Sequence, residues 1–97
     1  MGIIWDEKAC YRCGITVNLH KHHIFYGSAN RALSEKDGCY CTLCAKCHSA
    51  IHVPKNVVDV EYKKWLMSTA QKKWQAHYQK TKKDFIERYG KSYEQTY

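Results

Sequence analysis

The segment LCAKCHSAIH, which spans residues 43–52, decides how this chain folds, because it sets thiol and imidazole groups at the spacing of metal ligands. Cys44 and Cys47 form a CxxC pair, in which both thiolates can approach one ion from the same side. His48 and His52 are four residues apart, and residues at this spacing share one face of a helix. The segment therefore predicts a short helix that contributes to two metal sites.

A second CxxC pair, at Cys10 and Cys13, completes a set of four thiolates. Zinc binds four thiolates in a closed tetrahedron, so a site of this composition is structural and leaves no open coordination position. A redox-active CxxC and a disulfide are the alternatives, and two pairs in one short basic chain argue against both. The sequence therefore predicts a structural Zn²⁺ site with the ligands Cys10, Cys13, Cys44 and Cys47.

Apolar residues alternate with polar ones from Ile15 onward, which predicts a strand that runs to Tyr26 and ends before a glycine. Ser28 is the expected N-cap of a short helix that continues to about residue 36 and is followed by an Asp-Gly turn. The next expected elements are a strand over residues 39–43 and a helix over residues 45–52, which ends before a proline.

Two cysteines in the second expected strand, Cys39 and Cys41, lie outside the four-thiolate set. Free cysteines are commonly buried as small apolar residues, and we expect this fate for both. Either could instead replace a zinc ligand, and a redox role for either would predict thiol-dependent activity.

The rest of the chain, residues 54–97, has apolar residues at steps of three and four, which is typical of helices. One helix of about 20 residues is expected from near Asp59, with Trp65 and Trp74 in the core rather than stacked on bases. A second helix over residues 81–89 would be capped by a threonine and ended by a glycine.

Residues 1–97 are thus expected to form a single α+β domain. Its metal-bound half is residues 1–53, and its helical tail, residues 54–97, packs on that half. A chain of this length buries a small core and often needs a disulfide or a bound metal for stability. Here the metal would supply that stability.

The formal net charge is +7, from 16 Lys and Arg against 9 Asp and Glu, which favours a polyanionic partner such as nucleic acid. Many small basic proteins bind no nucleic acid, so charge alone does not decide the partner. No apolar run approaches the roughly 20 residues of a membrane span, and the N-terminus lacks the pattern of a signal peptide. We therefore expect no membrane association and a cytoplasmic location, where thiols stay reduced.

A His-His pair, His22 and His23, lies near the end of the first expected strand. Adjacent strand residues point to opposite faces, so one histidine could join a metal while the other addresses a substrate. A second closed zinc site that uses some of these histidines is the structural alternative.

These residues resemble the HNH (His-Me finger, ββα-metal) nuclease family. The resemblance spans residues 10–52 and rests on three motifs: Cys10-x2-Cys13, Lys21-His22-His23-Ile24, and Leu43-Cys44-x2-Cys47-His48-x3-His52. The stretch over residues 22–31 also resembles small HNH-like proteins of bacteriophages and prophages, which implies a bacterial or phage-encoded protein.

The resemblance implies a ββα-metal core and metal-dependent hydrolysis of DNA phosphodiester bonds. It assigns His22, His48 and His52 as ligands of one divalent ion and His23 as the general base. The ion stays open among Zn, Mg, Mn, Ni and Co. The chemistry agrees, because histidine has an unperturbed pKa of about 6.5 and can accept a proton from water near neutral pH.

The chain departs from the family at its middle Asn, whose place holds Cys39. That Asn helps to orient the general base, so Asn30 or a backbone carbonyl would have to hold His23 instead. If neither does, the alternative function is a non-catalytic zinc-binding nucleic-acid-binding or adaptor protein.

Phosphate contacts are expected from basic side chains near the site. The candidates are Lys21, Arg31, Lys46 and Lys55, of which Arg31 is favoured because a guanidinium can grip phosphate through two donors. Lys46 and Lys55 could equally serve only to solubilise the surface. One monomer would hold one active site and nick one strand, so cutting both strands would call for a homodimer or two encounters.

Overall fold

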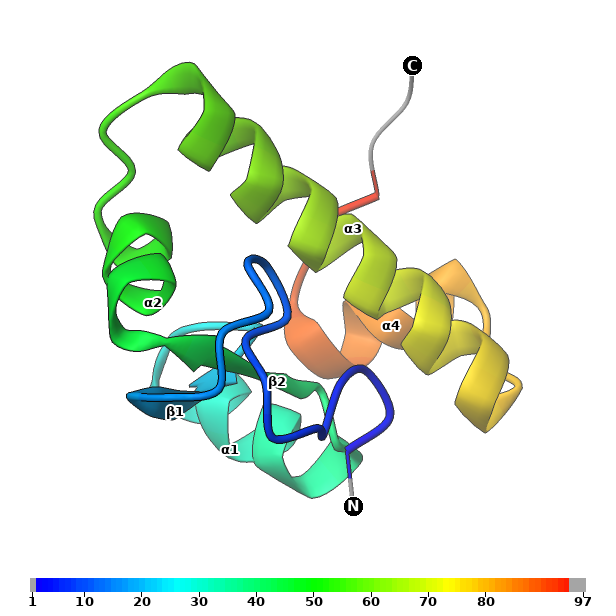
Figure 1. Ribbon diagram of the computed structural model, residues 1–97. Coiled ribbons are helices and arrows are strands. Elements are labelled where there is room, and N and C mark those ends of the chain that lie inside the picture. Colours follow the sequence, from blue (N-terminus) through cyan, green and yellow to red (C-terminus); the bar gives the residue numbers. More distant parts are fainter. Residues whose placement is uncertain (1, 95–97) are drawn as a thin grey trace.

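A two-stranded antiparallel sheet and four helices make up residues 2–94, the part of the chain that the computed structural model describes (Figure 1). Their order is β1 (Leu19–His23), α1 (Ser28–Asp37), β2 (Tyr40–Cys44), α2 (Ala45–His52), α3 (Val57–Tyr78) and α4 (Lys82–Tyr89). The small α+β fold expected from the sequence is therefore confirmed. None of the helices in these residues is long and apolar enough to span a bilayer.

The sheet register positions the residues of both predicted metal sites. β1 and β2 pair so that His22 lies opposite Cys41 and Leu19 lies opposite Cys44. α2 follows β2 without a break and returns against β1, which brings the ring of His48 to a centroid distance of 5.1 Å from the ring of His22. In Figure 1, α3 runs above the sheet and α1 below it.

The first strand is shorter than the alternation in the sequence predicts. β1 begins at Leu19 and ends at His23, so the expected extension over residues 15–18 and on to Tyr26 is wrong. Ile15 and Val17 are 45% and 61% exposed, so their alternation marks no buried face. This segment instead closes the loop of the first CxxC pair, and β2 begins one residue later than expected, at Tyr40.

Gly27, and not Ser28, is the N-cap of α1, and no side chain caps this helix. Gly27 has a φ of 96°, a conformation that glycine adopts without the steric penalty of a side chain. The Asp-Gly turn at the other end is as predicted, because Gly38 ends the helix in the left-handed conformation with a φ of 79°.

Side-chain caps define the starts of both tail helices. The Asn56 side chain accepts a hydrogen bond from the Asp59 N–H at 2.9 Å, so α3 starts slightly before the expected position. Thr81 and Asp84 form a capping box at the start of α4, and Gly90 ends this helix, as the sequence predicts.

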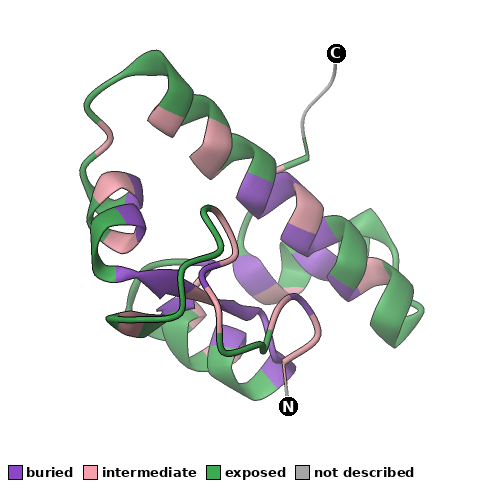
Figure 2. Cartoon of the chain, in the orientation of Figure 1, coloured by how far each residue is buried: buried purple, intermediate pink, exposed green. Residues whose placement is uncertain are grey.

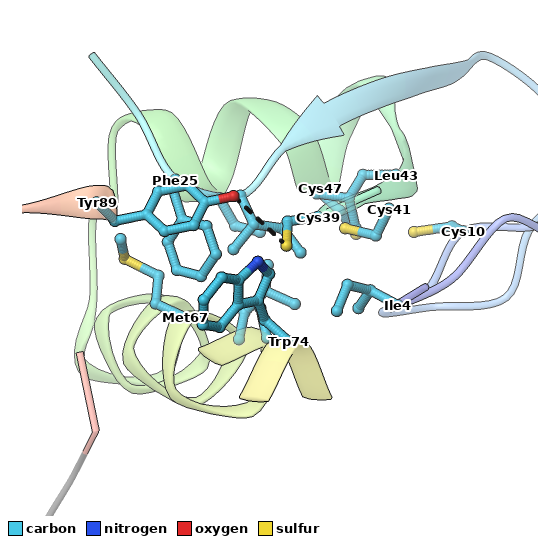
Figure 3. Close-up of a cluster of buried hydrophobic side chains, with 14 of the residues drawn as sticks. Ile4, Cys10, Phe25, Cys39, Cys41, Leu43, Cys47, Met67, Trp74 and Tyr89 are labelled. Atoms are coloured by element: carbon cyan, nitrogen blue, oxygen red, sulfur yellow. Dashed lines mark hydrogen bonds between the residues drawn. The ribbon is translucent and has the colours of Figure 1, made fainter. Parts of the chain in front are cut away.

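One apolar core joins the metal-bound half to the helical tail (Figures 2 and 3). In Figure 3, Phe25 lies against Tyr89, whose hydroxyl is 3.9 Å from the sulfur of Cys39. Cys39 and Cys41 are fully buried, which confirms their expected apolar role. Trp74 is also buried, whereas Trp65 is 45% exposed, so the prediction of a core position is wrong for Trp65.

A buried carboxylate, Asp37, fastens the end of α1 to both tail helices. It accepts hydrogen bonds from Trp74 Nε1 at 2.8 Å, from the Tyr89 hydroxyl at 2.7 Å, and from two guanidinium nitrogens of Arg88 at 2.6 Å. Burial raises the pKa of Asp37, but the bonds from Arg88, Tyr89 and Trp74 outweigh this effect and hold the pKa below its ordinary value. The carboxylate is therefore charged while it is enclosed.

Candidate metal centres

The four predicted zinc ligands come together at one point. The sulfur atoms of Cys10, Cys13, Cys44 and Cys47 all lie within 4.8 Å of one another. All six cysteines of the chain are free thiols, so no disulfide competes for these sulfurs. Neither Cys39 nor Cys41 belongs to the group, so neither replaces a ligand in this arrangement.

Local backbone structure explains how the first pair is presented. The Gly14 N–H donates to the carbonyl of Cys10, and the Cys10 N–H donates to the carbonyl of Ile15, both at 2.8 Å. Gly14 has a φ of 83°, which this tight turn requires. The Tyr11 N–H donates to the Thr42 carbonyl at 2.8 Å, and this bond ties the loop to β2 and so to the second CxxC pair.

The spacing of the sulfurs fits a tetrahedral ion. Zn–S bonds of about 2.3 Å imply a sulfur-to-sulfur edge of about 3.8 Å in a regular tetrahedron. The sulfurs of Cys13 and Cys44 are 3.7 Å apart. The four cysteines therefore form a possible tetrahedral metal site, consistent with structural zinc.

The electrostatics of the cluster favour a cation. Burial raises the pKa of Cys10, but backbone N–H groups of Cys44, Cys13 and Arg12 outweigh it and lower the pKa to about 6. Burial and the neighbouring thiols raise the pKa of Cys47. The first thiolate thus opposes ionisation of its neighbours, and a bound cation would remove that opposition.

The three predicted histidine ligands form a second group. Donor nitrogens of His22, His48 and His52 lie within 4.8 Å of one another. The Nε2 atoms of His48 and His52, one turn apart on α2, are 3.0 Å apart, near the edge of about 3.3 Å that Zn–N bonds would give in a tetrahedron. Three ligands leave a position that water or phosphate could take.

Two histidines of this group, His22 and His48, are held in the neutral form that binds metals. Burial, followed by the neighbouring His48 and His52, lowers the pKa of His22 to about 3. Burial and His52 also lower the pKa of His48. Imidazole binds a metal only when it is neutral, so the arrangement favours coordination over protonation at neutral pH.

His20 supports this group, a role that was not predicted from the sequence. Its Nδ1 lies 3.1 Å from Nδ1 of His48. With His48 Nδ1–H as the donor, Nε2 of His48 keeps its lone pair for a metal. The pattern that could have found it is the i, i+2 spacing of His20 and His22, which places both on one face of β1.

His23 lies outside the group of three, and Glu35 holds it. Its Nε2 is 2.7 Å from a carboxylate oxygen of Glu35 on α1. Lys21 Nζ donates to the same carboxylate at 3.1 Å. The bond from His23, followed by the bond from Lys21, lowers the pKa of Glu35, so this carboxylate stays charged.

Asn30, one of the two groups suggested for holding His23, is engaged elsewhere. The Asn30 side-chain amide donates to the backbone carbonyl of Tyr89 at 3.0 Å and so joins α1 to α4. Glu35 takes the orienting position because α1 packs beside β1 and sets its carboxylate level with Lys21 and His23. No pattern in the sequence pairs two residues so far apart.

One cleft of about 490 Å³, which we call the histidine cleft, is lined by His22, His23, His48 and His52. Its other walls come from Lys21, Tyr26, Gly27, Ser28 and Arg31. Lys21 and Arg31 thus border the cleft as expected for phosphate contacts, whereas Lys46 and Lys55 are exposed and do not line it. Lys63 borders a neighbouring pocket together with His22 and His52.

Comparison with known proteins gave no significant match to a protein-family model, to a curated protein or to a solved structure.

Proposed function

We propose that this chain is a metal-dependent endonuclease of the HNH type that hydrolyses DNA phosphodiester bonds. The observation that supports the proposal is that the histidines of the cleft fall into two sets, a candidate ligand group and a separate histidine. The donor atoms of three histidines converge, and a fourth, His23, shares the cleft but is held by a carboxylate outside that group.

The residues that would hold the catalytic ion are His22, His48 and His52. The chemistry that such an ion supplies when bound is stabilisation of charge on the scissile phosphate and on the leaving oxygen. His20 keeps His48 in the tautomer that can coordinate. Zn, Mg, Mn, Ni and Co stay open as the ion, although three imidazoles suit a transition metal better than Mg²⁺.

His23 acts as the general base. Because its Nε2–H donates to Glu35, its Nδ1 is the nitrogen that can take a proton from water. The water oxygen attacks phosphorus, the bond from phosphorus to the leaving oxygen breaks, and the imidazolium that forms is stabilised by the charged Glu35. Glu35 thus performs the orienting task that the family gives to its middle Asn.

Charge around the cleft supports a polyanionic substrate. Arg31 is exposed at the wall of the histidine cleft and is the residue proposed to grip the phosphate. Lys21 donates to Glu35, and its Nζ lies 4.3 Å from the centroid of the Tyr40 ring. Because these contacts within the protein already use its charge, Lys21 would contribute less than Arg31 to phosphate binding. Lys46 and Lys55 remain proposed contacts for DNA that extends beyond the cleft.

The cysteine cluster is proposed to be a structural zinc site that fixes α2. It joins the first loop of the chain to the strand end and the first turn of the helix that carries His48 and His52. Loss of this ion would release that helix and with it the histidine cleft.

A nicking assay with supercoiled plasmid tests the proposal. The wild type, His23→Ala and the control His77→Ala, which changes an exposed histidine on α3 that does not line the cleft, are compared with each divalent metal added in turn. We expect nicking by the wild type and the control, and a loss of about a hundredfold or more in His23→Ala. Absence of nicking with every metal, or equal nicking by all three proteins, would leave the non-catalytic adaptor as the better account.

A further inference from the structure

A second, smaller pocket adjoins the histidine cleft, and the proposed chemistry does not use it. This side pocket of about 210 Å³ shares three walls, His22, Tyr26 and His52, with the cleft. It lies where α2, the first half of α3 and the connection from β1 to α1 meet. Its remaining walls come from the apolar side chains of Ile24, Ile51, Leu66 and Met67 and from Lys63.

The rim of the side pocket combines an aromatic ring with a positive charge. Tyr26 is 55% exposed, although it is a large aromatic residue next to a buried phenylalanine. It borders the histidine cleft, the side pocket and a third hollow that is also bordered by Lys63 and Lys91. Lys63 Nζ lies 4.9 Å from the centroid of the Tyr26 ring.

The walls of the two spaces select different chemical groups. Against Ile51, Leu66 and Met67 a phosphate would lose its hydration without gaining a partner, so the apolar part of the side pocket disfavours it. The lysine of the pocket, Lys63, lies beside the Tyr26 ring at the rim. A flat and largely apolar ring fits such walls and can stack on an exposed tyrosine. A nucleotide carries both groups on one unit, a phosphate suited to the cleft and a base suited to the pocket.

We propose that the side pocket binds an unpaired nucleobase next to the phosphate that lies in the histidine cleft. This inference rests on the proposed function and narrows its substrate to nucleic acid with an unpaired nucleotide at the cleavage position, as in a single strand, a bulge or a flap. A base in an intact duplex would first have to leave its stack, which disfavours a fully paired substrate. The third hollow, with Lys63 and Lys91, would take the next phosphate along the strand.

The first test measures binding without cleavage. The His23→Ala protein, labelled at its methyl groups, is titrated by NMR with a short thymidine oligonucleotide and, separately, with a blunt duplex of the same length. We expect the methyl resonances of Ile51 and Met67 to shift with the single strand and to stay nearly unchanged with the duplex. Equal shifts with both, or no shift with either, would overturn the proposal.

The second test separates the pocket from the chemistry. Tyr26→Ala should bind the oligonucleotide about tenfold more weakly, whereas Tyr26→Phe, which keeps the ring, should bind nearly as the wild type does. In cleavage, the wild type should prefer a bulged duplex to a perfect one by about tenfold or more, and Tyr26→Ala should lose this preference.

The outcomes distinguish the two proposals. Cleavage of bulged and perfect duplexes at equal rates, with no methyl shift, would refute the side pocket and leave the nuclease standing. Selective methyl shifts that depend on the Tyr26 ring, in a protein that nicks nothing, would support the side pocket and refute the nuclease.

Discussion

Replacing Asp37 with asparagine should destabilise the fold by about 3 kcal/mol, because this carboxylate is the acceptor for four bonds that join α1 to the tail. One oxygen accepts from Trp74, Tyr89 and Arg88, and the other accepts from a second nitrogen of Arg88. An amide has one acceptor atom, so in either orientation its NH₂ group faces a donor. The loss is less than that of a fully buried ion pair, because the Arg88 side chain is 33% exposed.

The pH dependence of this difference follows from the lowered pKa of Asp37. A carboxyl group whose pKa is lower in the folded state stabilises the fold fully above its unfolded pKa, about 3.9, and loses that contribution as the pH falls through the folded value. The difference between wild type and Asp37→Asn should therefore be constant from about pH 5.5 to pH 8.

Urea unfolding followed by circular dichroism, with zinc present, measures the difference at several pH values. Glu87→Gln, which changes an exposed carboxylate on the same helix as Arg88, is the control and should lie within about 0.5 kcal/mol of the wild type. A cost below about 1 kcal/mol for Asp37→Asn, or a cost that grows steadily across this pH range, would refute the account of Asp37 as a charged anchor.

Three further changes test the sites. Cys44→Ser should lose one zinc per chain, measured by elemental analysis, and should no longer unfold cooperatively. The control Cys41→Ala should keep its zinc. Retention of zinc by Cys44→Ser would contradict the four-cysteine site. His20→Ala should bind metal at the histidine group about tenfold more weakly in a chelator competition. The control His77→Ala should bind it as the wild type does. An unchanged metal affinity of His20→Ala would show that His20 does not position His48. Glu35→Ala should nick plasmid about tenfold more slowly than the wild type but bind DNA equally well. The nicking rate of Glu35→Gln should lie between those of the wild type and Glu35→Ala. A wild-type nicking rate in Glu35→Ala would show that His23 needs no orienting carboxylate.

The sequence was sufficient wherever the determinants were local. Within each CxxC pair, and between the i, i+4 histidines, turn and helix geometry alone fixes the spacing of the ligand atoms, and these spacings are as predicted. The boundaries of α2 and the capping box at Thr81 also depend only on neighbouring residues. These features could be predicted without knowledge of the fold.

The sequence was insufficient wherever contacts between distant segments decide the outcome. Residues 15–18 have the alternation of a strand, but the Ile15 carbonyl accepts from the Cys10 N–H and the Asn18 carbonyl accepts from the Ala45 N–H. Trp65 has the helical spacing of a core residue, yet it faces Tyr11 and Tyr62 at the edge of the core. Glu35, and not Asn30, holds His23 because the rotation of α1 against its neighbours, which no local pattern encodes, decides which side chain faces His23.

The same contacts give the helical tail a part in the proposed catalysis, although it contributes no ligand and no base. Glu35 can hold His23 only if α1 keeps its position beside β1. That position is fixed by Asp37 at the end of α1, through Trp74, Arg88 and Tyr89, and by Asn30 near its start, through the Tyr89 carbonyl. Asp37→Asn should therefore slow nicking even under conditions in which the protein stays folded, and it should do so by misplacing Glu35. In a protein that already carries Glu35→Ala, the same change should have little further effect on the rate, because the two residues act through the same helix.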